Sequence, residues 1–145
     1  MLKEFEIIDF DVIRENWNEY LIEDGTKLRV KFIMIKVLKN KNMGEDYRFN
    51  CTHVIGITSP LNRSGQPSVI HDPKEVLNSI IQEDIGFKEI KVDWNEYRLK
   101  DNNKIMAKPV ITLIQKTDKF DEFGDPIYNI QIQAIFKALP KKKLR

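Results

Sequence analysis

The sequence predicts a mainly β protein in which one antiparallel unit is used twice, and alignments within the chain lead to this expectation. The tetrapeptide Trp-Asn-Glu-Tyr occurs at Trp17–Tyr20 and again at Trp94–Tyr97, and it contains the only two tryptophans of the chain. Residues 17–39 align with residues 94–116 without a gap, at an offset of 77 positions. A match of this length indicates an internal duplication.

A second block continues the match after loops of unequal length. Residues 47–57 can be laid on residues 128–138, with a tyrosine at the start of each. Neither half is expected to fold alone, because a unit of about 60 residues with open sheet edges is marginally stable. We therefore expect one domain with pseudo-two-fold symmetry, either a barrel or a sandwich. Its repeat halves are residues 1–63 and 87–145, joined by a loop and a helix in residues 64–86.

The first strand of each half precedes its tryptophan. Apolar residues alternate with aspartates in residues 5–13, which is typical of a half-buried strand. Ile90 and Val92 repeat this spacing before the second tryptophan. We therefore expect the same order of strands in both halves.

Each tryptophan begins a hairpin whose turn contains an aspartate. In the first hairpin Asp24-Gly25 marks the turn, and glycine supplies the positive φ that a bulged three-residue loop requires. In the second hairpin Asn102 replaces the glycine, and asparagine also tolerates the left-handed conformation. A two-residue loop would give less consistent pairs in the two halves. The bulged loop predicts four cross-strand pairs: Tyr20 with Leu28, Trp17 with Lys31, Tyr97 with Ile105 and Trp94 with Lys108.

The long strands 27–39 and 104–116 do not alternate cleanly, because apolar residues adjoin one another in the middle of each. Either both faces are covered there, or a β-bulge shifts the phase. Pro109 lacks an amide donor, so we expect it at an edge or a bulge. The last strand of each half alternates well, and its inward positions include Cys51 and the corresponding Ile132.

One helix is expected between the halves, from Asp72 to Ile85. Asp72, Pro73 and Glu75 fit the N-cap, the first helical position and the third position of a capping box. Gly86 is expected to end the helix. The apolar residues that would form one stripe against the sheets are Val76, Leu77, Ile80 and Ile81.

Sequence patterns for several common chemistries are missing. The six glycines are scattered singly, so no phosphate-binding loop is present. Two histidines and one cysteine are too few for a typical structural zinc site, and we expect no metal and no cofactor. Cys51 and His53 share one strand face and could form a thiolate–imidazole pair. Because the corresponding Ile132 and Ala134 are apolar, we expect both to be core residues, with Cys51 buried.

The repeated motif offers further candidates for ligand binding. Glu19 and Glu96 are the carboxylates that the duplication preserves beside an aromatic residue, and a two-fold axis could bring them together. Alternatively, Glu19 bridges Arg29 across its own hairpin. Trp17 and Trp94 fit packing anchors better than a ligand-binding pair, and the pair is the alternative interpretation.

Basic residues favour nucleic acid as an alternative partner. Lys27, Arg29 and Lys31 line one strand opposite Trp17, and cations interleaved with aromatic rings are typical of nucleic-acid binding. A solvated strand face whose lysines guard a sheet edge explains the same residues, and the net charge is only +2. The C-terminal tail adds four cations: Lys141, Lys142, Lys143 and Arg145.

The expected function is non-catalytic binding or assembly through sheet edges and hairpin surfaces, with another protein or a second copy as partner. The first alternative is a nucleic-acid or ribonucleoprotein-associated factor. The second is an enzyme or a small-ligand-binding barrel around Cys51 and His53. The chain has no apolar run long enough for a membrane span, and a single cysteine with a polar N-terminus favours a cytoplasmic protein.

Overall fold

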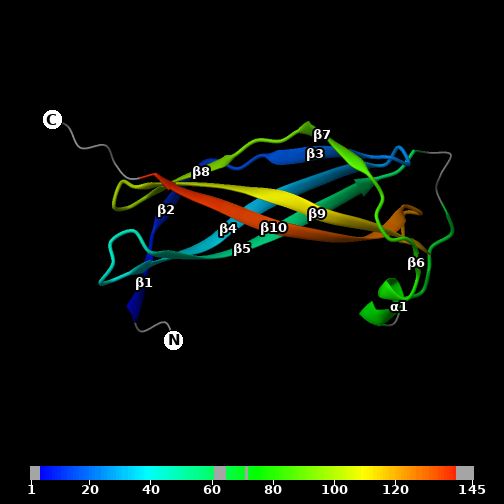
Figure 1. The fold of residues 1–145 in the computed structure, drawn as a ribbon, viewed down its shortest axis with the longest axis horizontal. Helices are drawn as coiled ribbons and strands as arrows, with labels where there is room; N and C mark the ends of the chain where they lie inside the picture. The colour runs from blue at the N-terminus through cyan, green and yellow to red at the C-terminus, as the bar shows by residue number, and fades with distance from the viewer. Residues whose placement is uncertain (1–3, 61–64, 71, 140–145) are drawn as a thin grey trace.

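The structure is a computed structural model that describes residues 4–60, 65–70 and 72–139. This part of the chain is mainly β, with two antiparallel sheets and one short helix, as the sequence predicts (Figure 1). The elements are β1 (Phe5–Ile8), β2 (Phe10–Arg14), β3 (Trp17–Ile22), β4 (Lys27–Asn40), β5 (Tyr47–Thr58), α1 (Pro73–Leu77), β6 (Ile80–Gln82), β7 (Phe87–Lys91), β8 (Asn95–Leu99), β9 (Lys104–Phe120) and β10 (Pro126–Leu139).

A long two-stranded hairpin forms the centre of each sheet. In the first sheet β4 pairs with β5 along one side, while β3 and β1 share its other side. In the second sheet β9 pairs with β10 along one side, while β8 and β6 share its other side. Within the described part of the chain β5 and β10 each have one paired neighbour, so both are edge strands.

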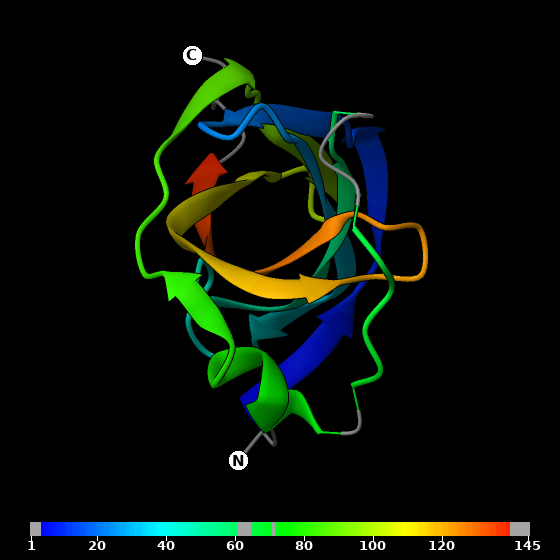
Figure 2. The same cartoon turned by 90° about the vertical axis from the view of Figure 1, so that its right-hand side faces the viewer.

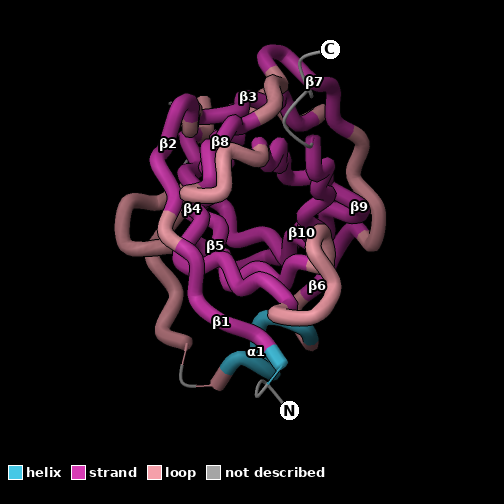
Figure 3. Tube along the Cα trace, turned by 90° about the vertical axis from the view of Figure 1, so that its left-hand side faces the viewer, coloured by secondary structure: helices cyan, strands magenta, loops and turns pink. Residues whose placement is uncertain are grey.

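Two short strands cross from one half of the sequence to the sheet of the other half. β2 follows β1 but pairs with β8, and β7 follows β6 but pairs with β3. Viewed from either end, the strands surround a common interior (Figures 2 and 3). Each sheet therefore depends on strands from both halves of the chain.

The predicted registers of the tryptophan hairpins are confirmed. Gly25 and Asn102, at corresponding places in the two turns, have φ angles of 89° and 68°. Asparagine therefore takes over the left-handed position of the glycine, as expected. The predicted pairs found in the strand registers are Tyr20 with Leu28, Trp17 with Lys31, and Tyr97 with Ile105.

A β-bulge in each long strand explains the broken alternation. The register of β4 against β5 shifts at residue 35, and that of β9 against β10 shifts at residue 112, which is 77 positions later. Pro109 lies in a stretch of β9 that neither β8 nor β6 covers. Because the Leu99 N–H donates to the Asn103 carbonyl, alternation turns the Pro109 nitrogen toward that uncovered side. The proline therefore removes no hydrogen bond from the ladder.

Two clusters of buried apolar side chains fill the interior, and each draws on both halves. The first contains Tyr20 of β3 and Ile114 of β9, and the second contains Phe32 of β4 and Tyr97 of β8. All four side chains are at most 2% exposed. The hydrophobic contribution to folding is therefore shared across the halves.

The helix predicted from Asp72 to Ile85 is wrong in its extent. α1 covers five residues, and the Asp72 carboxylate accepts a hydrogen bond from the Lys74 N–H at 2.9 Å as its N-cap. The chain then forms β6, which pairs with β9. The isoleucines at positions 80 and 81 explain the difference, because a short β-branched run suits a strand as well as a helix. Gly86 consequently lies between β6 and β7 and does not end a helix.

The predicted packing of this segment is also wrong. Leu77 and Ile81 are 54% and 63% exposed, and none of the five residues of α1 is buried. A single helical turn presents too little apolar surface to dock on a sheet. The segment contributes β6 to the second sheet, while α1 stays at the surface (Figure 1).

Replacing Leu77 by alanine should change the free energy of unfolding by less than about 0.5 kcal/mol, because its side chain is largely exposed. Leu28→Ala should cost about 2–5 kcal/mol, because Leu28 is fully buried. Urea unfolding followed by tryptophan fluorescence measures both changes. A loss of several kcal/mol in Leu77→Ala would show that α1 packs firmly on the sheets.

Candidate functional site

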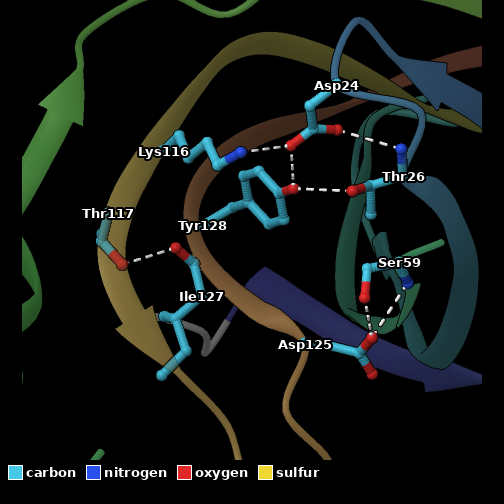
Figure 4. A network of polar contacts seen from close by, with 8 residues as sticks. All are labelled: Asp24, Thr26, Ser59, Lys116, Thr117, Asp125, Ile127 and Tyr128. Carbon is cyan, nitrogen blue, oxygen red and sulfur yellow. Dashed lines mark hydrogen bonds and ion pairs between the residues drawn. The ribbon is translucent and has the colours of Figure 1, made fainter. Parts of the chain in front are cut away.

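Carboxylate, ammonium and phenol groups meet at two places where the halves of the chain touch. At the first, the Asp24 carboxylate accepts hydrogen bonds from Lys116 Nζ at 2.8 Å and from the Tyr128 hydroxyl (Figure 4). The Tyr128 hydroxyl also lies 2.9 Å from Thr26 Oγ1, and the second Asp24 oxygen accepts from the Thr26 N–H at 3.0 Å. The turn of the first hairpin is thereby tied to the end of β9 and the start of β10.

The second place repeats the first with the halves exchanged. The Asp101 carboxylate accepts hydrogen bonds from Lys39 Nζ and from the Tyr47 hydroxyl, the latter at 3.0 Å. The Asn103 side-chain amide donates to the Tyr47 hydroxyl at 2.7 Å. We call the two clusters the reciprocal clasps: Asp24 with Lys116 and Tyr128, and Asp101 with Lys39 and Tyr47.

The first clasp has a second polar contact beside it. The N–H and the hydroxyl of Ser59 both donate to the Asp125 carboxylate (Figure 4). The Thr117 hydroxyl donates to the Ile127 carbonyl at 2.6 Å. These contacts join the end of β5 and the end of β9 to the start of β10.

The clasps contain the groups of an acid–base site, but a substrate has little access to them. The Asp24 side chain is 7% exposed. Burial alone would raise its pKa, but hydrogen bonds from Lys116, Tyr128 and Thr26 outweigh burial and lower the pKa to about 2. Burial, together with the hydrogen bond to Asp24, raises the pKa of Tyr128. Because neither group changes its charge near neutral pH, we assign the clasps a structural role.

Cys51 and His53 face inward on β5, but Cys51 is half-buried, so the prediction that it is buried is wrong. The reason is that β5 is an edge strand, and the corresponding Ile132 on β10 is half-buried as well. Burial raises the pKa of the Cys51 thiol and lowers the pKa of His53. Among the described residues no hydrogen bond joins the two, and His53 Nε2 has no partner. The contact that activates a nucleophile is therefore missing.

Each motif tryptophan carries two cations over its ring, and the predicted tryptophan–lysine contacts are confirmed. The distances from cation to ring centre are 4.5 Å for Arg29 and 5.9 Å for Lys31 over Trp17, and 4.9 Å for Lys108 and 4.5 Å for Lys137 over Trp94. Such contacts hold the rings in place and occupy faces on which a ligand would stack.

Glu19 and Glu96 each bind a lysine of their own hairpin. Glu19 lies 3.4 Å from Lys27 Nζ, and Glu96 lies 3.6 Å from Lys104 Nζ. The predicted bridge from Glu19 to Arg29 is wrong, because Arg29 lies over the tryptophan ring. The two glutamates belong to different sheets, and each is neutralised within its own hairpin.

β5 and β10 lie next to one another without pairing, and we call this side of the molecule the open side. Phe49 of β5 stacks on Phe136 of β10, with ring centres 4.2 Å apart and planes inclined by 12°. No described strand pairs with the second edge of either. The inward side chains of both strands are only partly buried, in contrast to those of β4.

The hydrogen-bond pattern identifies the unpaired backbone groups of the open side. The Ile22 N–H donates to the Thr26 carbonyl, just before β4. Counting every second residue from Thr26, the backbone N–H and C=O groups of β4 point toward β3, and those of the residues between point toward β5. The bond from Leu99 to Asn103 sets the same pattern for β9 and β10. The residues whose N–H and C=O point away from the partner strand are Cys51, His53, Ile55 and Ile57 on β5, and Ile132, Ala134, Phe136 and Ala138 on β10.

Most of each edge strand lacks the charges that usually protect an edge; the exceptions are Arg48 near the start of β5 and Lys137 near the end of β10. Residues 49–58 and 126–136 contain no Asp, Glu, Lys or Arg. Val54, Ile55 and Ile135 are 42%, 43% and 39% exposed. By contrast, the edge strands β2 and β7 are five residues long and contain charged residues. Long, uncharged, apolar edges pair readily with another strand.

The open side is filled at one point and hollow at the corresponding one. Phe49 and Phe136 fill the first point with their stacked rings. In the alignment of the two halves, Ile130 and Ile55 stand at the corresponding positions, and a pocket of about 350 Å³ lies beside them. Apolar side chains of both strands form most of its lining. Two isoleucines in place of two phenylalanine rings account for this space.

The sequence does not predict the clasps, although a signal for them is present. Lys39 and Lys116 are identical at the offset of 77, and Tyr47 and Tyr128 begin the second aligned block. Identity at polar positions of both halves marks a contact that the fold needs twice. The sequence contains no comparable signal for the free edges, because the sequence of one strand does not show whether a second strand pairs with it.

Comparisons with protein-family models, with curated proteins and with solved structures find no match. The described residues contain no helix that is long and apolar enough to cross a membrane. They also contain no group of three or more His, Cys, Asp or Glu side chains that could hold a metal ion. The basic tail, Lys141 to Arg145, lies outside the described residues.

Asp24→Asn should destabilise the protein and flatten its stability profile in acid. The folded pKa of about 2 lies below the ordinary value of 3.8. The ionised clasp therefore contributes about 2 kcal/mol above pH ~4, and this contribution is lost as the pH falls toward ~2. Urea unfolding at a series of pH values measures it. Asp118→Asn, at a side chain that is 58% exposed, is the control, and the same acid slope in wild type and Asp24→Asn would contradict the assignment.

Cys51 should react slowly with iodoacetamide in the native protein at neutral pH. Burial raises its thiol pKa, so the thiolate fraction is below that of a free thiol, and the half-buried position limits access. The rate should rise with pH and reach the free-thiol rate in denaturant. Rapid native labelling at neutral pH would instead support the thiolate–imidazole pair.

Proposed function

We propose that the protein is a non-catalytic binding or assembly protein that pairs with a partner strand through the free edges of β5 and β10. The observation that carries this proposal is the length of the two free edges, on strands of 12 and 14 residues that are uncharged over residues 49–58 and 126–136. Such an edge offers a row of N–H and C=O groups to an added strand. Main-chain hydrogen bonds then supply affinity in the manner of β-augmentation.

The side chains of the open side would supply the specificity. The pocket beside Ile55 and Ile130 suits an apolar side chain on one face of the added strand. Asp121 is the one charged residue in the lining of this pocket, and residues 49–58 and 126–136 of the two strands are uncharged. Along the free edges a charged side chain would therefore lose hydration without meeting an opposite charge. The partner strand is therefore apolar and uncharged.

We further propose that the fold is an internal duplication, arranged as a half-open barrel with a pseudo-two-fold axis. Supporting this, the pairings of β1, β2 and β3 are matched by those of β6, β7 and β8. The clasps and the bulges recur in the same correspondence. The axis exchanges β5 with β10, so the two edges present like surfaces. The single cysteine supports a reducing, cytoplasmic location as part of the proposal.

Nucleic-acid binding is the second candidate, and the cations around Trp17 and Trp94 favour it. Four cationic side chains lie within 6 Å of these two rings. A phosphate backbone could bind there, although nearby Glu19 and Glu96 reduce the positive charge. This candidate uses the outer faces of the sheets and leaves the free edges without a role.

A labelled synthetic peptide with the sequence of residues 126–136, flanked by lysines for solubility, should bind the full chain in a fluorescence-anisotropy titration. Ile55→Pro removes an N–H that points to the open side, and it should weaken binding about tenfold or more. The matched control, Ile55→Ala, keeps the N–H and should bind more tightly than the proline variant. Absence of binding by the wild-type chain at a concentration at which it is monomeric, or equal affinity of both variants, would remove the support for edge pairing.

If nucleic acid is the partner, Lys31→Glu combined with Lys108→Glu should weaken binding to single-stranded RNA and reduce its dependence on salt. Both lysines lie over the motif tryptophans. Electrophoretic mobility shifts at low and physiological salt measure the effect. No shift of RNA or DNA by the wild-type chain at low salt would eliminate this candidate.

A further inference from the structure

We propose that the partner of the free edges is a second copy of this chain, so that the open sides of two copies meet in a closed dimer. This inference rests on the proposed function and names its partner. Each copy brings two free edges of 12 and 14 residues that lie next to one another on its open side. Two copies related by a two-fold axis can therefore pair both edges at once.

The chemistry of the two edges is self-complementary. Neither residues 49–58 nor residues 126–136 contain a charge, so no charged group is buried when like edges meet. Val54 and Ile135 stand at corresponding positions of the two strands and are 42% and 39% exposed. Each can meet an equally apolar neighbour on the other copy. A charged partner surface would find no opposite charge along these edges.

A second copy can also pair with both free edges, whereas a single extended peptide can pair with only one. A peptide paired with β5 leaves the free edge of β10 without a partner, and the peptide becomes a new edge strand itself. A two-fold dimer leaves none of the four long edges free. It also covers the half-buried inward side chains of both open sides, including Cys51 and Ile132.

Sedimentation velocity over a wide range of concentration tests the inference with the full chain. The wild type should sediment as a dimer that dissociates on dilution. Ala134→Pro removes an N–H of β10 that points to the open side, and it should weaken the dimer about tenfold or more. Ala134→Ser keeps the N–H and is the matched control. Circular dichroism checks that both variants keep the β fold.

A second pair of variants leaves the backbone intact. Val54→Lys with Ile135→Lys places like charges along both edges and should also favour the monomer. Ile7→Lys with Ile81→Lys is the control: it changes two apolar residues on β1 and β6 that are both 63% exposed, and it should leave the dimer intact.

The outcomes separate this inference from the function on which it rests. A chain that stays monomeric but binds the peptide of residues 126–136 overturns the second copy and keeps edge pairing. A chain that does neither overturns both. A dimer that the edge variants leave intact, or growth into open-ended oligomers, also overturns the closed dimer.

Discussion

The arrangement of the two sheets depends on the reciprocal clasps, because each joins a turn of one half to strands of the other. Asp24 lies in the first half and its partners, Lys116 and Tyr128, lie in the second. Asp101 and its partners reverse this order. Removing one member of such a partly buried, hydrogen-bonded ion pair leaves the other charge without its partner, which destabilises the fold. Together with the exchange of β2 and β7 between the sheets, the clasps hold the halves together, while one edge of β5 and one edge of β10 have no paired strand.

The differences between the halves are as informative as their likeness. Over Trp17 the second cation is Arg29, and Gly56 on the neighbouring strand leaves room beside it. At the corresponding positions of the second half the cation comes from Lys137, and Met106 replaces the arginine. The cation has moved by one strand and still covers the tryptophan. This exchange indicates that the contact serves packing in both halves.

Sequence patterns that act over a few residues predict the fold well. The turn at Gly25 and the corresponding turn at Asn102 set the hairpin registers. The broken alternation of apolar and polar residues in the long strands predicts the bulges. Patterns that depend on distant partners predict it less well. The isoleucines at positions 80 and 81 fit a predicted helix, because β9, the strand with which their segment pairs, is distant in the sequence. Cys51 is more exposed than expected because inward alternation does not reveal whether a strand has a neighbour on its second edge.

Backbone amide exchange, resolved residue by residue by NMR in the dilute protein, tests the free edge of β5 most directly. The N–H groups of Thr52 and Val54 face β4, whereas those of His53 and Ile55 face the open side. The account predicts slow exchange at Thr52 and Val54, and fast exchange at His53 and Ile55 that slows when the edge is paired. Equally slow exchange at all four residues in the dilute, monomeric protein would contradict it.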